Sequence, residues 1–260
     1  MRTEQKWYGG EPIWITAKKQ GKRANVFHWP GSNVNFTGMT PDFYFPQYSH
    51  EPPLEKRLEK IIEWVDEGVD LSMMYFYQPD NIAHKNGVFS VVLGKEVERI
   101  DTVLGKFIDE LSKPERNHVD LIIVADHGMV NYTEVVVLSD YINFEEEVER
   151  MPQYGAIASI LPKPGKLEIV YEKLKNAHPN ITVYLKDEIP ERLRYKHPTR
   201  TMPIIIIGNE GVQIVEKREY FNKRKIAHHG YDNTLPSMHP IFFAMGPSFR
   251  KKSEIQPFDA

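Results

Sequence analysis

Apolar side chains in the first half of the chain alternate between helical and strand-like spacings. After two prolines, apolar residues recur every three or four positions and predict an amphipathic helix that ends near Gly68: Leu54, Leu58, Ile61, Ile62 and Val65. The apolar run 72–77 has strand length and precedes a Pro-Asp turn, which predicts a buried strand. A second apolar stripe predicts a longer helix that Pro114 ends: Val97, Ile100, Leu104, Phe107, Ile108 and Leu111.

The uniformly apolar run 121–125 predicts a central strand of a parallel sheet, because strands buried on both faces lack polar alternation. Strand, helix and strand in this order form a βαβ unit, so we expect an α/β fold with a mostly parallel central sheet. Ligands of such sheets bind outside the carboxyl ends of the strands. Polar clusters follow the runs 72–77 and 121–125, and a third precedes the apolar segment 240–245. We therefore expect the three clusters to converge.

Residues 150–220 follow a different pattern, with apolar runs at 156–161 and 203–207 on either side of a predicted helix around 167–175. This pattern is consistent with a second, smaller sheet. No Gly/Ser-rich or Pro-rich linker separates it from the rest of the chain, and we find no internal repeat. We therefore assign residues 1–260 to a single domain.

The charge balance argues against a nucleic-acid or membrane-surface partner. The chain has 33 Lys and Arg residues against 36 Asp and Glu residues, and its net charge of −3 gives no positive field to attract a nucleic-acid duplex or anionic lipid. No apolar run approaches the ~18 residues that a transmembrane helix needs. Cysteine is absent, which excludes a disulfide framework, thiolate metal ligands and a cysteine nucleophile.

Two segments after predicted strands carry carboxylate and imidazole side chains together. Asp80 and His84 stand four residues apart, so a helical turn would place both on one face, where they can chelate a divalent metal. Asp126 and His127 are adjacent at the end of a predicted strand. Because a strand directs neighbours apart, this pair would serve one metal through an irregular turn, or two adjacent metals.

A third segment adds an imidazole from the doublet His228-His229, although spacing alone does not decide which ring is used. Carboxylate and imidazole ligands without thiolate suit Zn²⁺ with an open coordination position. Two such ions about 4 Å apart would suit phosphoryl transfer.

At these residues the sequence resembles the ectonucleotide pyrophosphatase/phosphodiesterases, members of the alkaline phosphatase superfamily. The segments that resemble the family's three metal-ligand motifs are PDNIAH at 79–84, DHGM at 126–129 and HGYDN at 229–233. Further similar segments are WYGGEPIW at 7–14, WPGS at 29–32, VYLK at 183–186 and IPER at 189–192. The last two are closest to the short membrane-anchored members. The resemblance runs from residue 7 to residue 257 and implies a three-layer α/β/α fold.

The resemblance implies a metal-ligand set. Asp80, His84 and His229 match the ligands of one zinc ion. Asp126 and His127 match two ligands of the other. The implied cofactor is therefore two Zn²⁺.

The resemblance also implies a substrate site and a missing nucleophile. Tyr48 matches the aromatic residue on which the nucleotide base stacks in members that cleave nucleotides, whereas the sequence alone favours a packed loop tyrosine. In the family, a nucleophilic threonine and a further metal-binding aspartate precede the segment that matches 7–14. We therefore expect this chain to be the C-terminal portion of one phosphodiesterase catalytic domain, incomplete at its N-terminus and without a catalytic nucleophile. Such a chain should have little activity.

We expect the longer parent to hydrolyse phosphodiester or pyrophosphate bonds in nucleotides and to be secreted or membrane-anchored. Asn-x-Ser/Thr sequons at Asn35, Asn131 and Asn180 fit a glycoprotein. Two alternatives stay open. One is a non-catalytic zinc-binding protein for recognition at the cell surface. The other is a phosphodiesterase of choline lipids, since a tyrosine ring also faces a quaternary ammonium.

Overall fold

The computed structural model describes residues 4–221 and 225–259 of the chain. Its contacts divide the chain into two compact units. The first unit comprises residues 1–78, 95–123 and 243–260, and the second comprises residues 79–94 and 124–242. The single domain expected over residues 1–260 stays a prediction.

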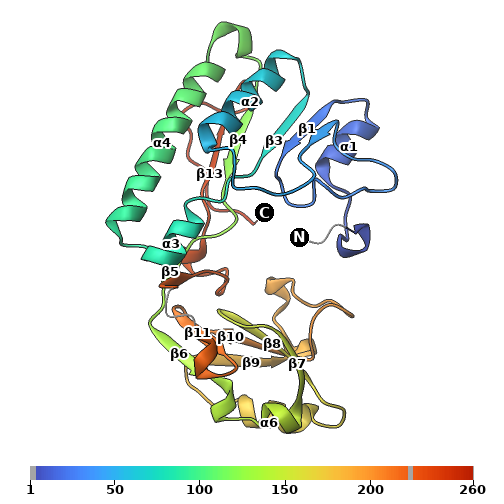
Figure 1. Ribbon diagram of the computed structural model, residues 1–260, viewed down its shortest axis with the longest axis vertical. Coiled ribbons are helices and arrows are strands. Elements are labelled where there is room, and N and C mark those ends of the chain that lie inside the picture. The colour runs from blue at the N-terminus through green and yellow to red at the C-terminus, as the bar shows by residue number, and fades with distance from the viewer. Residues whose placement is uncertain (1–3, 222–224, 260) are drawn as a thin grey trace. The chain divides into compact units, whose positions relative to one another are not determined.

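The first unit is built on short strands with helices packed against them (Figure 1). Its elements are α1 (Ile13–Lys19), β1 (Ala24–Phe27), β2 (Phe43–Tyr44), α2 (Leu54–Asp66), β3 (Leu71–Met74) and most of α4 (Val91–Leu111), β4 (Leu121–Val124) and β13 (Phe242–Met245). One sheet has the order β2-β1-β3, with both pairings parallel, and β4 pairs with β13 in another. These strands and helices agree with the expected α/β class.

Helix α2 forms where the apolar periodicity predicts it. Its buried residues lie three or four positions apart on one face: Leu54, Arg57, Leu58, Ile61 and Trp64. The apolar members share a core cluster with Phe27 of β1 and with Phe107 and Leu111 of α4. The Arg57 guanidinium is fully buried and donates to four main-chain carbonyls, those of Ser49, His50, Pro52 and Tyr75. Arg57 therefore ties the segment before α2 to the residue that follows β3.

The strands β3 and β4 are less buried than their apolar runs predict. The four residues of β3 are all half-buried, so the predicted burial of 72–77 is wrong although a strand is present. In β4 the side chains alternate, and Ile122 and Val124 are 55% and 50% exposed. Among the described residues, β3 pairs only with β1, and β4 only with β13. The exposed residues of β4 alternate along the strand and therefore share one face, which the described residues leave largely uncovered.

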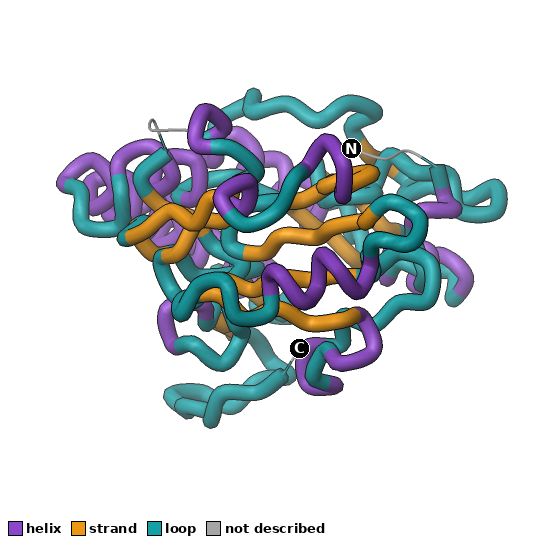
Figure 2. The backbone as a smooth tube through the Cα atoms, turned by 90° about the horizontal axis from the view of Figure 1, so that it is seen from below, coloured by secondary structure: helices purple, strands orange, loops and turns teal. Residues whose placement is uncertain are grey.

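The second unit contains an antiparallel sheet of order β7-β8-β10-β9, which confirms the smaller sheet predicted from the sequence. Its elements are α3 (Asp80–Asn86), β5 (Val130–Asn131), β6 (Glu134–Val137), α5 (Phe144–Glu147), β7 (Val148–Gln153), β8 (Ile157–Pro162), α6 (Leu167–Leu174), β9 (Ile181–Leu185), β10 (Ile204–Gly208), β11 (Val212–Val215) and β12 (Ala227–His228). Figure 2 shows the backbone from below, with all the strands in orange.

The core of the second unit is aliphatic. Ile160, Ile204 and Ile206 are fully buried in one cluster with residues of α6 and β9. Two short strand pairs lie outside the main sheet: β11 runs parallel to β6, and β12 runs antiparallel to β5. Within the described residues, no helix combines the length and apolar character needed to cross a bilayer.

Candidate metal centre

Asp80 and His84 lie on one face of α3, as their spacing predicts. The helix ends at Gly87, whose φ of 84° lies in the left-handed region that favours glycine. A Cβ at Gly87 would also lie only 2.9 Å from Oδ1 of Asn131, so β5 approaches the end of α3 closely. Oδ1 of Asp80 lies 3.3 Å from Nε2 of His84.

His127 is held by the turn that follows β4. Its Nδ1 donates to the carbonyl oxygen of Gly128 at 2.8 Å. The N–H of Gly128 in turn donates to the carbonyl oxygen of Met238 at 3.0 Å. A Cβ at Gly128 would lie 1.9 Å from the carbonyl oxygen of Ser237, so only glycine fits here. The turn that carries His127 is therefore packed directly on the main chain of residues 237–238.

His229 follows β12, which is hydrogen-bonded to α3. The carbonyl oxygen of Ala227 accepts a bond from Nδ1 of His84 at 2.7 Å. The N–H of Ile226 donates to the carbonyl oxygen of His84 at 2.7 Å. These bonds place the end of β12 beside α3, so two of the three predicted ligand segments lie together.

Three imidazole nitrogens surround one carboxylate oxygen. Besides its contact with His84, Oδ1 of Asp80 lies 3.6 Å from Nε2 of His229 and 4.0 Å from Nε2 of His127. This oxygen is buried and has no hydrogen-bond partner of good geometry among the described residues. Two groups have candidate ligand atoms within 4.8 Å of one another: Asp80, His127 and His229, and His84, His228 and His229. A buried carboxylate oxygen ringed by imidazole nitrogens fits a divalent cation such as Zn²⁺.

The hydrogen bonds of His84 and His127 leave their Nε2 atoms able to bind a metal. In both rings Nδ1 faces a main-chain carbonyl, which only accepts, so Nδ1 carries the hydrogen. In the neutral ring the lone pair is then on Nε2, the atom nearest Asp80. Metal-binding histidines commonly donate their other nitrogen in this way.

Burial and charge together set the protonation states of these side chains. Burial acts to raise the pKa of Asp80, but the neighbouring imidazoles, with His84 foremost, outweigh it and hold the pKa below its ordinary value. The Asp80 carboxylate in turn raises the pKa of His84. Burial, assisted by the charge of His127, lowers the pKa of His229 to about 4. His229 is therefore neutral, as a ligand must be, at neutral pH.

Asp126 differs from the other four predicted ligands. Its side chain is 75% exposed, and its Oδ1 lies 3.5 Å from Nε2 of His127. It belongs to neither of the two groups described above. The assignment of Asp126 and His127 to a second metal ion stays a prediction.

His228 also faces this region, which its spacing does not predict. Its ring stands edge-on to that of His84, with ring centroids 5.2 Å apart. The sequence signal for it is the doublet with His229, which strand alternation would send to opposite faces. A short strand that ends at His228 relaxes that rule.

Tyr48 lies in the first unit and is half-buried among other rings. Its ring centroid lies 5.5 Å from that of His28, 5.6 Å from that of His50 and 6.1 Å from that of Tyr75. Burial raises the pKa of the Tyr48 hydroxyl, so the ring is uncharged at neutral pH. Its role in stacking on a base stays a prediction.

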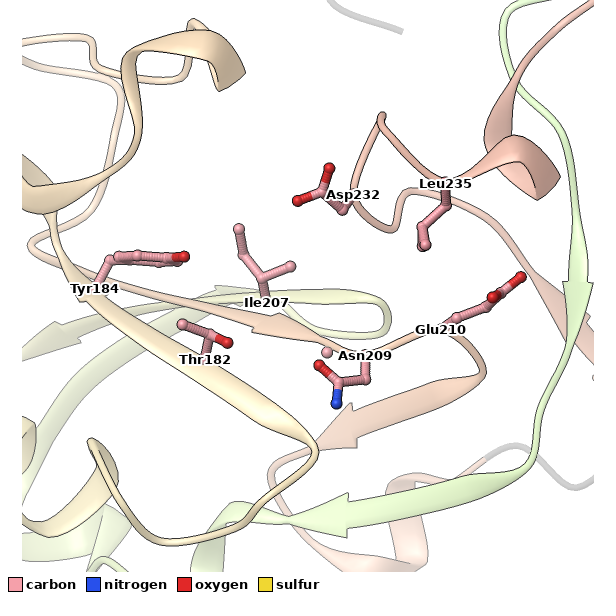
Figure 3. Close-up of a pocket in the computed structure, with 8 residues that line it drawn as sticks. Thr182, Tyr184, Ile207, Asn209, Glu210, Asp232 and Leu235 are labelled. Atoms are coloured by element: carbon pink, nitrogen blue, oxygen red, sulfur yellow. The ribbon is translucent and has the colours of Figure 1, made fainter.

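A cavity of about 250 Å³ opens elsewhere on the second unit, beside β9 and β10 (Figure 3). Its polar lining includes Thr182, Tyr184, Glu210 and Asp232. Asp232 is already paired with Arg192, whose Nη1 lies 2.7 Å from Oδ1. None of the lining residues belongs to the His and Asp groups, so this cavity is not part of the candidate metal centre.

Comparison with known proteins identifies similar chains. Residues 1–232 match the family model for type I phosphodiesterase / nucleotide pyrophosphatase. The chain is 39% identical over 250 residues to human ectonucleotide pyrophosphatase/phosphodiesterase family member 5, with 94% of this chain and 51% of that protein covered. It is 34% identical over 251 residues to human bis(5'-adenosyl)-triphosphatase ENPP4, with 94% and 54% covered. The chain spans about half the length of these curated relatives.

Solved structures show the same likeness. An inactive variant of murine ectonucleotide pyrophosphatase/phosphodiesterase 5, in complex with AMP, matches with a TM-score of 0.86 at 38% sequence identity. The match covers 93% of this chain and 64% of that one. It confirms the alkaline-phosphatase-like α/β fold expected from the sequence motifs.

Proposed function

Because the chain belongs to the type I phosphodiesterase / nucleotide pyrophosphatase family, we propose that the whole protein, rather than these 260 residues alone, is a metal-dependent hydrolase of phosphodiester or pyrophosphate bonds in nucleotides. The observation that carries the proposal is the convergence of three Nε2 atoms on the Asp80 carboxylate. Two relatives support the substrate class. One is named as a bis(5'-adenosyl)-triphosphatase, and the solved structure of another contains AMP.

The proposed cofactor is two Zn²⁺, with Asp80, His84 and His229 as ligands of one ion and Asp126 and His127 as ligands of the other. Neutral imidazole and carboxylate donors without thiolate support zinc. When bound, the metal ions would neutralise the negative charge of a phosphate group. The donors support this too, because neutral imidazoles leave a metal centre with net positive charge that attracts a phosphate.

The proposed contact for the base is Tyr48. Its ring is uncharged and half-buried, so stacking on a flat base would cover apolar surface that water now contacts. Stacking of a base on an aromatic side chain is worth about 1–3 kcal/mol. The hydroxyl is the only polar group of this side chain. Tyr48 is therefore better suited to stack on the face of a base than to recognise the base by several hydrogen bonds.

We further propose a secreted or membrane-anchored glycoprotein whose glycan is on Asn35. Asn35 and Thr37 of this sequon are exposed, and Nδ2 of Asn35 makes no hydrogen bond to any described residue. The other two sequons are engaged within the second unit. Oδ1 of Asn131 accepts a bond from the main chain after α3, and Nδ2 of Asn180 donates to Glu134 at 2.7 Å. Both of these amides are also half-buried, so a glycan on Nδ2 would have less room there than on the exposed Asn35.

The test of the metal centre is zinc content, measured by elemental analysis of the purified chain. We expect about two zinc ions per chain. Asp80→Ala should lose at least one of them, because it removes the carboxylate at the centre of the group. Asp109→Ala, at an exposed position of α4, is the matched control and should leave zinc content unchanged. Equal zinc content in both variants would count against the proposal.

A further inference from the structure

His228 ends β12 and contacts the main chain of its neighbour His229. Its Nδ1 accepts a hydrogen bond from the N–H of His229 at 2.8 Å. An acceptor nitrogen carries no hydrogen, so in the neutral ring the hydrogen is on Nε2.

The His228 ring is packed between two aromatic rings and the main chain at Gly155. It stands edge-on to the ring of His84, with planes 84° apart, and edge-on to the ring of Tyr132, with centroids 5.8 Å apart. A Cβ at Gly155 would lie 3.0 Å from Nε2 of His228, so that nitrogen lies against the main chain. Gly155 is itself held by two hydrogen bonds with Ile214, of 2.9 and 2.8 Å. Rotation of the His228 ring therefore meets neighbours that cannot easily move.

These contacts give His228 a different role from that of the predicted metal ligands. Its ring lies close enough to His84 and His229 for the three to share an ion. However, the lone pair of Nδ1 is used by the N–H of His229, and Nε2 lies against Gly155. His84 differs, because its carbonyl contact is on Nδ1 and its Nε2 is turned toward Asp80.

We propose that His228 is a positioning residue of the metal centre. Its Nδ1 fixes the main chain of His229, and its ring flanks His84, so that both imidazoles present Nε2 to Asp80. The proposal rests on the metal-binding function proposed above. Supporting groups behind metal ligands typically change metal affinity by about 10–100-fold.

The matched pair His228→Leu and His228→Asn tests this role. The two side chains have the same branched shape, but only Asn carries Oδ1 on Cγ, where it can accept the N–H of His229 as Nδ1 does. We expect His228→Leu to weaken Zn²⁺ binding by about 10–100-fold, and His228→Asn to keep most of the wild-type affinity. Affinity is measured on the full chain by competition with a chromophoric chelator. His118→Leu, at an exposed position, is the control.

Two further measurements distinguish the possible results. Zinc stoichiometry should be the same in both His228 variants, because neither removes a ligand; loss of one ion in both would overturn the proposal in favour of direct ligation. Wild-type affinity in His228→Leu, or equal weakening in Leu and Asn, would also overturn it. If His228→Leu does not fold without metal, the affinity of His228→Asn decides. An Asp80→Ala chain that binds zinc normally would instead refute the metal centre itself.

Discussion

The imidazole rings of His127 and His229 stack face to face, with centroids 3.4 Å apart and planes 7° apart. Two protonated rings cannot share this arrangement, because like charges so close together in a partly buried site repel strongly. The stack therefore forms with at least one ring neutral. The burial and neighbouring charge that lower the pKa of His229 to about 4 agree with this requirement.

The metal-free chain should lose stability as the pH falls from about 6.5 to about 4. In the unfolded chain His228 and His229 take up protons near their ordinary pKa of about 6.5, whereas in the folded chain they do so near 4. The unfolded state binds more protons between these values, so the stabilisation is full above 6.5 and is lost as the pH falls. The raised pKa of His84, caused by Asp80, has the opposite effect on stability. We expect the two lowered pKa values of His228 and His229 to outweigh it.

Denaturant unfolding at several pH values, with a chelator present, measures this dependence. His228→Asn removes one of the two groups and should flatten the curve, because asparagine does not titrate. Stability that rises on acidification to pH 5, or a His228→Asn chain with the wild-type dependence, would contradict the prediction.

Replacing Gly128 by Ala should displace the turn that carries His127. The new Cβ would lie 1.9 Å from the carbonyl oxygen of Ser237, and a main-chain atom cannot rotate away. We expect the free energy of unfolding to fall by about 1–3 kcal/mol, with weaker zinc binding. The control is Gly94→Ala in α4, where no heavy atom lies within 4 Å of the added Cβ and alanine favours the helix. Equal stability of the two variants by denaturant unfolding would show that the turn can adjust.

Replacing Arg57 by Met should destabilise the first unit by about 2–4 kcal/mol, because buried carbonyls then lose their donors. Arg57→Lys should recover little of this loss, since an ammonium group cannot reach four separated carbonyls as the planar fork does. The exposed Arg150→Met is the control. Thermal unfolding of the three variants measures the difference, and a lysine variant as stable as wild type would show that charge alone suffices.

Asn35 should be the glycosylated sequon of the folded chain. When the chain is directed into the secretory pathway of a eukaryotic cell, enzymatic removal of N-glycans should reduce its mass, and Asn35→Gln should abolish that shift. Asn131→Gln and Asn180→Gln should leave the shift intact, because these amides are engaged in internal hydrogen bonds. Site mapping by mass spectrometry of the folded, secreted fraction gives the answer directly. A glycan found there on Asn131 would disprove the assignment.

Local periodicity was enough to predict much of the fold. The apolar spacing in α2 and α4 gives their location, and the aliphatic runs at β8 and β10 give the second sheet. The spacing of Asp80 and His84 also predicts their shared face, because it depends only on helix geometry.

The rest depends on contacts between distant parts of the chain. His228 gains its contacts from Gly155 and Tyr132, and no local pattern relates these positions. The exposure of Asp126 and of Ile122 in β4 likewise depends on which strands and loops cover them. The local sequence does not predict those contacts. Sequence patterns therefore predict secondary-structure elements and candidate ligands. The histidine tautomers, the residues that surround the His228 ring and the exposure of each side chain depend on the assembled structure.

The metal centre joins α3, the turn after β4 and the end of β12 in a chain that contains no cysteine. An ion held by these segments would act as a cross-link between residues that lie far apart in the sequence. Like a disulfide, it would restrict the unfolded chain more than the folded one, because closing long loops removes conformational entropy. Binding free energy then becomes folding free energy. For this protein a chelator would do what a reducing agent does to a disulfide-bonded one.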